Sequence, residues 1–119
     1  MQTLYNVDGA AVAYIDDDGS SIYLYSGSPV GWMSDEYVYA YSGRYLGWMQ
    51  NGWMYDRSGH PAFFTEGSSG GPVRPVRQVR PVRGVRAVRP VRGVREVRPV
   101  RPVRSLNWSA LSGEDYFDQ

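Results

Sequence analysis

Eleven arginines recur at every third position of one stretch of this chain, and they are the side chains best suited to binding chemistry. A guanidinium group binds carboxylates and phosphates through paired hydrogen bonds, and it also stacks on aromatic rings. The chain contains no lysine, so apart from one histidine every basic side chain is of this kind. The spacing predicts a cationic stripe made of Arg74, Arg77, Arg80, Arg83, Arg86, Arg89, Arg92, Arg95, Arg98, Arg101 and Arg104.

The other polar residues do not assemble into a recognisable reactive site. His60 is the only histidine, and a single histidine beside a turn is more often structural than catalytic. Because cysteine and lysine are absent, covalent catalysis would depend on a serine without an evident base. The acidic run at residues 16–18 lacks the alternating ligands and distal glutamate of a calcium loop, so we interpret it as a solvated turn. We predict that the chain is not an enzyme and has no catalytic residue, metal or cofactor, and we identify no small-molecule substrate.

The arginines belong to eleven consecutive X-Val-Arg triplets over residues 72–104. Six of the triplets begin with proline, and each proline would cost about 3 kcal/mol inside an α-helix. A period of three matches polyproline II, whereas a collagen helix would need glycine in every triplet. We expect an extended polyproline-II-like tract, roughly 100 Å long, with separate valine, arginine and leading-residue stripes. Such a tract must protrude from a small domain, fold back between residues 84 and 94, or be shared between subunits.

Charge divides the chain into segments of opposite sign. Residues 1–71 carry a net charge of −6, residues 72–104 one of +10, and residues 105–119 one of −3. We assign residues 1–67 to a head domain, residues 68–71 to a Gly/Ser linker, residues 72–104 to the triplet tract and residues 105–119 to a C-terminal docking segment that carries Trp108. No stretch approaches the ~20 apolar residues of a membrane span, and the first ten residues do not resemble a signal peptide. We therefore expect a cytoplasmic protein.

The head contains a repeat of about sixteen residues. Its clearest copies are residues 24–33 and 40–49, which share a Tyr-Ser-Gly turn and end in Gly-Trp-Met. Further copies lie at residues 56–65 and 7–15. Sixteen residues suit one β-hairpin, and the Asp-Gly or Ser-Gly pairs put glycine where a hairpin turn needs positive φ. The head is therefore predicted to be all-β, with four hairpins. Its strands are expected near residues 11–15, 21–25, 29–33, 37–41, 45–49, 53–56 and 61–65.

Alternation along these strands predicts one apolar face and one aromatic face. The apolar face, taken as the core, contains Ile22, Leu24, Val30, Trp32, Val38, Ala40, Leu46, Trp48, Met54, Ala62 and Phe64. The opposite face has Ala13, Gly31 and Gly47 as gaps and includes the ring of Phe63. Its candidate interaction residues are Tyr23, Tyr37, Tyr39, Tyr41, Tyr45, Trp53 and Tyr55. Tyrosine suits an interface because its ring is apolar and its tip is polar. We expect another segment to cover this face; the alternative is that it forms the second layer of a closed barrel.

The motifs Gly-Ser-Pro-Val-Gly-Trp and Gly-Arg-Tyr-Leu-Gly-Trp in this repeat resemble those of the bacterial four-fold β-flower proteins. The resemblance covers roughly residues 3–67. The Pro-Val-Arg-rich tail adds to the resemblance, because such a tail is also associated with these proteins. It implies four hairpin petals around a pseudo-four-fold axis. The fourth petal departs from the pattern, because Phe63 replaces a small residue and Arg57 replaces a tyrosine. The family has no assigned reaction, so the resemblance implies a fold and leaves the function open.

Three functional hypotheses remain. In the first, the tract packs on the aromatic surface of a head, within or between subunits, and the protein is a structural, assembly or protein-interaction module that forms a homo-oligomer. In the second, the arginine tract binds an anionic partner, either acidic membrane lipid or nucleic acid. The third is an enzyme or small-molecule binder that uses the centre or rim of the head. Resistance of the tract to trypsin would favour the first hypothesis.

Overall fold

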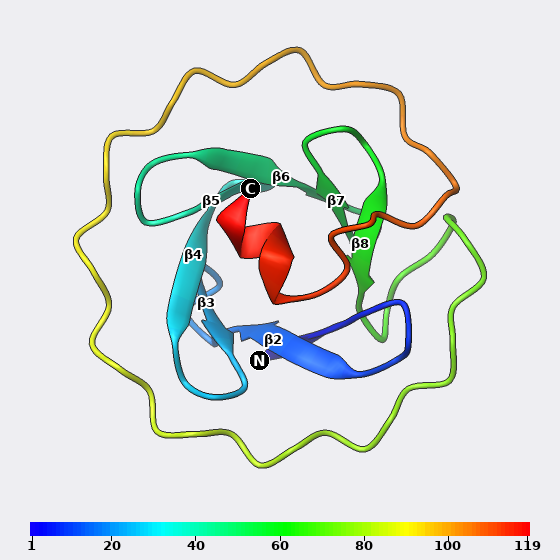
Figure 1. The fold of residues 1–119 in the computed structure, drawn as a ribbon, viewed down its shortest axis with the longest axis horizontal. Helices are drawn as coiled ribbons and strands as arrows, with labels where there is room; N and C mark the ends of the chain where they lie inside the picture. Colours follow the sequence, from blue (N-terminus) through cyan, green and yellow to red (C-terminus); the bar gives the residue numbers. More distant parts are fainter.

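Eight β-strands form one closed antiparallel barrel in the computed structural model, which describes residues 1–119 (Figure 1). The strands are β1 (Gln2–Tyr5), β2 (Ala11–Ile15), β3 (Ser21–Leu24), β4 (Pro29–Ser34), β5 (Tyr37–Tyr39), β6 (Tyr45–Gln50), β7 (Trp53–Asp56) and β8 (Pro61–Phe64). Consecutive strands pair into four hairpins, and β8 closes the barrel by pairing with β1. The predicted all-β fold of four hairpins is therefore confirmed.

The seven predicted strands are present, and their ends lie within two residues of the expected positions. The strand that the sequence did not predict is β1. It is short and precedes the first turn signal, so no repeat boundary marks its start. The role of β1 is to close the barrel, because its Tyr5 pairs with Phe64 in β8.

Each hairpin has the same irregularity in its second strand. The pairing register shifts by one residue, as at a β-bulge, opposite Leu4/Tyr5, Ile22/Tyr23, Val38/Tyr39 and Met54/Tyr55. The residues skipped in the pairing are Val12, Val30, Leu46 and Ala62. A bulge places two successive residues on one side of the sheet and reverses the alternation beyond it. In each second strand, the face occupied by odd-numbered residues before the bulge is therefore occupied by even-numbered residues after it.

Because of the bulges, the predicted face is wrong for some residues. Trp32, Trp48 and Phe64 were expected in the core from strict alternation, but they lie in separate aromatic clusters. Ala13 and Phe63 were expected on the aromatic face, and both belong to the core. The remaining predicted core residues form the core or pack against it, namely Ile22, Leu24, Val30, Val38, Ala40, Leu46, Met54 and Ala62.

The C-terminal segment fills the barrel from one end, where η1 (Glu114–Asp118) lies at the centre of the ring of hairpins (Figure 1). Tyr116 is fully buried there, and the Phe117 ring stacks on the Phe63 ring with centroids 5.9 Å apart. Gly47 leaves the necessary room, because a Cβ at this position would lie 1.8 Å from the Tyr55 carbonyl oxygen and 2.6 Å from the Tyr116 hydroxyl. Gly31 and Gly47, which were predicted as gaps in the aromatic face, therefore leave room for the core side chains Phe117 and Tyr116.

Residues 72–104 run as a ring around the outside of the barrel, and we call them the belt (Figure 1). The belt contains no helix or strand. With it, the molecule is a disc whose Cα atoms extend over 37 × 36 × 22 Å. The tract neither protrudes nor folds back: the stretch between residues 84 and 94, expected as a hinge, follows the ring like the rest. No helix in the structure has the length and apolar character needed to cross a membrane.

Candidate interaction site between the belt and the hairpins

The belt meets the barrel at the four hairpin tips. Each tip carries a glycine with positive φ, and these are Gly9, Gly27, Gly43 and Gly59. The carbonyl oxygen of each glycine accepts a hydrogen bond of 2.8 to 3.0 Å from a backbone N–H, and the donors in order are Gln78, Ala87, Glu96 and Ser105, the residue after the belt. Successive donors are nine residues apart. Each hairpin is therefore matched by three triplets.

The leading residues of the triplets encode this register. Besides the four tip donors, Gly84 donates its N–H to the Tyr25 carbonyl at 2.6 Å, and Gly93 donates to the Tyr41 carbonyl at 2.7 Å. These six are the non-proline leading positions, counting Ser105. Prolines hold the leading positions that donate nothing, namely Pro72, Pro75, Pro81, Pro90, Pro99 and Pro102. Because proline has no N–H to donate, the choice between proline and another residue follows the positions of the hairpins.

The sequence can therefore be divided into four nine-residue units that begin at Pro72, Pro81, Pro90 and Pro99. The three-residue period masks this longer period. The signal was present, because proline recurs without exception at every ninth residue while the other two leading positions vary. Comparing the number of nine-residue units with the number of hairpins would have found it.

Close packing explains why the tips carry glycine. A Cβ on Gly27 would lie 2.0 Å from the Val85 carbonyl oxygen, and one on Gly43 would lie 1.9 Å from the Val94 carbonyl oxygen. A Cβ on Gly9 would likewise lie 2.0 Å from the Val76 carbonyl oxygen. A turn with positive φ would by itself tolerate asparagine or aspartate. The belt removes that freedom, since its backbone occupies the space of any side chain.

Four stacked aromatic pairs join neighbouring hairpins outside the barrel core, and we call them the seams. Each seam takes one ring from the second strand of a hairpin and one from the first strand of the next. The pairs are Tyr14–Tyr23, Trp32–Tyr39, Trp48–Tyr55 and Phe64–Tyr5, with ring centroids 5.2 to 5.7 Å apart. All eight side chains are buried.

Belt arginines lie over the seams at cation–π distances. The shortest contacts with indole rings are those of Arg92 over Trp32 and Arg101 over Trp48, where Cζ lies 4.4 and 4.8 Å from the ring centroids. At 5.2 to 6.0 Å, the remaining seam contacts are Arg77 over Tyr5, Arg83 over Tyr14, Arg86 over Tyr23, and Arg95 over both Tyr39 and Trp32. Contacts of this kind contribute about 0.5–2 kcal/mol each. The arginines thus repeat the nine-residue register, because residues 77, 86 and 95 cover equivalent tyrosines.

Three of the seven tyrosines and tryptophans predicted as an interaction face lie directly under belt arginines. Tyr23 and Tyr39 are seam residues, and the Tyr37 ring centroid lies 3.9 Å from Arg98 Cζ. Arg74, Arg80 and Arg104 differ from the other predicted arginines, because none of them has a ring or carboxylate partner; Arg74 instead donates to the Glu66 and Ser68 carbonyl oxygens.

The other four predicted aromatic residues have different neighbours. Tyr45 lies under Arg57 of the fourth hairpin, and Trp53 packs edge-on against Trp108 of the C-terminal segment. Tyr55 completes a seam without a belt arginine over it, and Tyr41 is only partly buried.

Sequence reasoning missed four rings that the arginines do cover. Trp32 and Trp48 were assigned to the core because the bulges were not foreseen, and Tyr5 lies in the strand that was not predicted. Tyr14 was left out of both faces. Its spacing to Trp32 and Trp48 in the repeat is the signal that could have placed it.

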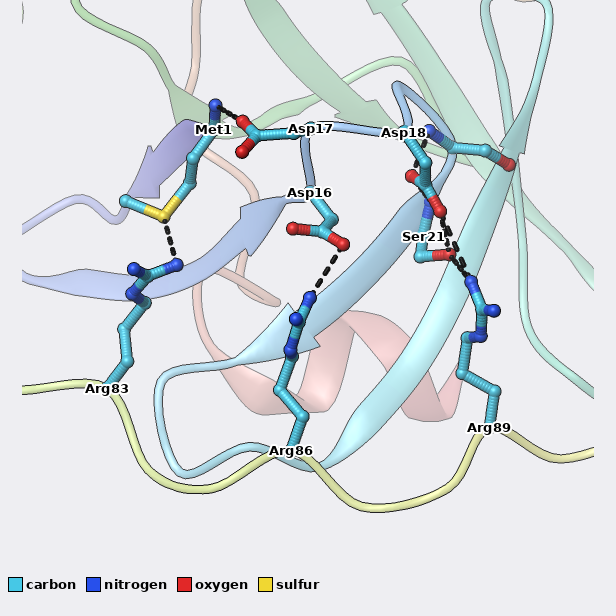
Figure 2. Close-up of polar contacts among 9 residues, drawn as sticks. Met1, Asp16, Asp17, Asp18, Ser21, Arg83, Arg86 and Arg89 are labelled. Carbon is cyan, nitrogen blue, oxygen red and sulfur yellow. Dashed lines mark hydrogen bonds and ion pairs between the residues drawn. The ribbon is translucent and has the colours of Figure 1, made fainter.

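Carboxylates in the loops between hairpins also bind the belt (Figure 2). Arg86 pairs with Asp16 at 2.6 Å, and Arg89 pairs with Asp18 at 3.2 Å. Partial burial would raise the pKa of Asp18, but hydrogen bonds from the Ser21 hydroxyl and two backbone N–H groups outweigh it and lower that pKa from 3.8 to about 2. Figure 2 shows that Asp17 instead binds the N-terminal amine of Met1. The acidic run expected as a solvated turn is therefore a partner of the belt.

Glu96 is the only acidic residue of the belt, and it anchors the third tip. Its carboxylate accepts hydrogen bonds from the Tyr45 backbone N–H at 2.6 Å and from Arg57 Nη1 at 2.7 Å. The hydrogen bond from Arg57 lowers the pKa of Glu96 in spite of slight burial. This pair accounts for the arginine that replaces tyrosine in the fourth hairpin. His60, the only histidine, is partly exposed, and its Nδ1 lies 3.9 Å from Asp56 Oδ1.

Tyr116 should make the fold sensitive to alkaline pH. Its hydroxyl donates to the Tyr55 carbonyl at 2.8 Å, and complete burial raises the pKa of Tyr116 well above 10.0. A raised pKa favours the neutral form, so this contribution to stability is complete below pH 10 and is lost as pH rises further. Tyr116→Phe should cost about 1–3 kcal/mol at pH 7, and its free energy of unfolding should fall less steeply above pH 10. Urea unfolding at a series of pH values measures both effects. Parallel pH curves for the two proteins would contradict the prediction.

Comparison with known proteins gives one match. A protein-family model described as the 4-fold beta flower protein matches residues 2–117, which include the hairpins, the belt and most of the C-terminal segment. That description assigns no catalytic feature. Searches of curated proteins and of solved structures found no significant match.

Proposed function

The chain belongs to the 4-fold beta flower family, and from that premise we propose that it is a non-enzymatic structural or protein-interaction module whose belt holds its four hairpins in a ring. The proposal rests on the register between belt and hairpins. Six backbone N–H groups at non-proline leading positions donate to hairpin carbonyls. A low-complexity tail with no structural role would have no reason to keep this correspondence.

The energetics support the belt as a fastening element. Belt arginines make nine cation–π contacts with rings of the head, each of about 0.5–2 kcal/mol. A proline-rich segment loses comparatively little conformational entropy when it docks, because it is already extended. Charge adds to this, since a belt of net charge +10 surrounds a head of net charge −6. Several weak contacts along one preorganised segment thus act together.

Trypsin digestion of the full chain tests this proposal. Trypsin does not cleave before proline, so six bonds can be cut after belt arginines, and each of them precedes one of the six docked donors. We expect these bonds to be cut at least about tenfold more slowly than in a free peptide of residues 72–108, because cleavage requires the docked backbone to detach. Mass spectrometry assigns each cut. Equal rates in the peptide and in the folded chain would overturn the proposal.

A homo-oligomer is part of the same proposal. Light scattering reports it directly, because a dimer or tetramer has a multiple of the chain mass of 13.4 kDa. Measurement in low and high salt separates ionic contacts from apolar contacts between copies, since only the ionic contacts are screened. A monomer at all salt concentrations would restrict the proposal to fastening within one chain.

A further inference from the structure

The valines of the belt are the most exposed apolar side chains in the molecule. Each is between 90 and 96% exposed, and they are Val73, Val76, Val79, Val82, Val85, Val88, Val91, Val94, Val97, Val100 and Val103. The leading residues face the hairpin tips and the arginines cross the seams, so the valines point away from the head. We call these eleven side chains the valine rim. Eleven exposed apolar side chains that recur at every third residue along one edge are a candidate surface for a partner.

A second copy of the chain fits this rim poorly. A stable interface between two proteins buries roughly 1,200–2,000 Å², but two convex discs of 37 × 36 Å that meet edge to edge touch through only a few triplets. Such contact would also bring together two belts that each carry a net charge of +10. Like charges across an interface disfavour association.

Nucleic acid would contact the arginines of the belt but would leave the valine rim without a partner. The arginines could contact phosphates, but an apolar rim has no counterpart on a phosphate backbone. Binding of single strands relies on aromatic side chains that stack on bases. The belt contains none, and the rings of the seams are buried beneath it.

An anionic lipid surface matches both the valine rim and the arginines of the belt. We infer that the belt docks on anionic membrane lipid, with an arc of the valine rim in the outer acyl region and the neighbouring arginines at the phosphates. The side chains of Arg86 and Arg89 are 48% and 50% exposed although each pairs with a carboxylate of the head, so both remain accessible beside the rim. Amphipathic surfaces of this composition lie at the boundary between headgroups and acyl chains, and arginine stems extend from apolar surface to polar headgroups. Lipid also deforms around a convex edge, which a rigid partner cannot do.

This inference goes beyond the fastening role, and the two can fail separately. The belt can hold the hairpins without binding any lipid, in which case trypsin protection persists and vesicle binding is absent. Conversely, lipid binding through a detached belt would appear as rapid cleavage in free solution.

Single-cysteine labelling of the full chain provides the test. The chain has no cysteine, so Val76→Cys, Val85→Cys, Val94→Cys and Val103→Cys each introduce one site for an environment-sensitive fluorophore, one near each hairpin tip. Asp115→Cys on η1 is the control position. With vesicles of phosphatidylcholine containing about a third phosphatidylglycerol, we expect blue-shifted emission at the valine positions and no shift at residue 115. Vesicles of phosphatidylcholine alone should give no shift at any position.

A matched variant separates insertion from simple charge attraction. Replacing all eleven rim valines with threonine keeps side-chain shape and the arginines, and it leaves the fold intact because the valines are at least 90% exposed. Co-sedimentation with the anionic vesicles should weaken at least about tenfold, while trypsin protection stays unchanged.

Each other outcome overturns the inference. Equal vesicle binding by the threonine variant, abolished by salt, would mean that the arginines alone adsorb to anions. Tighter binding to an RNA oligonucleotide than to vesicles would identify a nucleic-acid surface. A larger mass in light scattering that depends on the valines, without vesicle binding, would show that copies of the chain cover the rim. Absence of binding to any of these probes would also refute it.

Discussion

Gly47→Ala should destabilise the protein by about 3 kcal/mol or more, enough to leave much of the chain unfolded at 37 °C. Gly47 has φ of 154°, and its missing Cβ would lie 1.8 Å from the Tyr55 carbonyl oxygen. That oxygen belongs to the neighbouring strand β7 and cannot move without breaking the β6–β7 pairing. The Tyr116 hydroxyl, 2.6 Å away, would also be displaced. Urea unfolding followed by tryptophan fluorescence measures the loss.

Two further alanine variants calibrate this result. Gly67 has no atom within 4 Å of its Cβ position, so Gly67→Ala should change the free energy of unfolding by no more than about 0.5 kcal/mol. Gly31 is the equivalent of Gly47 in the second hairpin, and its Cβ would lie 2.7 Å from the Tyr39 carbonyl oxygen. Gly31→Ala should therefore fall between the other two. A Gly47→Ala protein as stable as Gly67→Ala would contradict the described packing of the bulge.

Exchanging donors and prolines along the belt should release it from the hairpins. The variant swaps Gln78 with Pro81, Ala87 with Pro90 and Glu96 with Pro99, so length, composition and net charge are unchanged. Three tip hydrogen bonds are lost because proline then faces the acceptor carbonyls of three tips. At about 0.5–1.5 kcal/mol for each bond, the belt should detach more often, and trypsin cleavage should accelerate at least about tenfold. Digestion at neutral pH, with fragments identified by mass spectrometry, measures the change.

The matched control replaces only Pro81, Pro90 and Pro99 with alanine and keeps all six donors. It loses the preorganisation that proline gives to an extended chain, but it retains the register. We expect its new Arg–Ala bonds to be cut and the docked bonds to remain protected. If the exchanged variant were cut no faster at its docked positions than this control, the nine-residue register would have no part in holding the belt.

Much of the fold could be predicted because the relevant signals are local. The four Asp-Gly or Ser-Gly turns require positive φ, which is a property of the turn itself, and they fixed the hairpins and most strand positions. The triplets exclude a helix through the local chemistry of proline. The sequence also indicated that arginines and aromatic rings were the candidate interaction residues.

The sequence by itself determined the four hairpins, the extended tract and the segregation of charge, since each follows from neighbouring residues. The tertiary structure decided the rest. The bulges that move Trp32 and Trp48 from the core to the seams depend on pairing between strands. Closure of the barrel depends on the pairing of Tyr5 with Phe64, which are 59 residues apart in the sequence. The belt's path depends on carbonyl acceptors that become ordered in space only when the barrel closes. A contact between distant segments is set by geometry that no local pattern contains, which is why the sequence shows the nine-residue period of the prolines but only the folded chain shows which hairpin carbonyl each belt N–H meets.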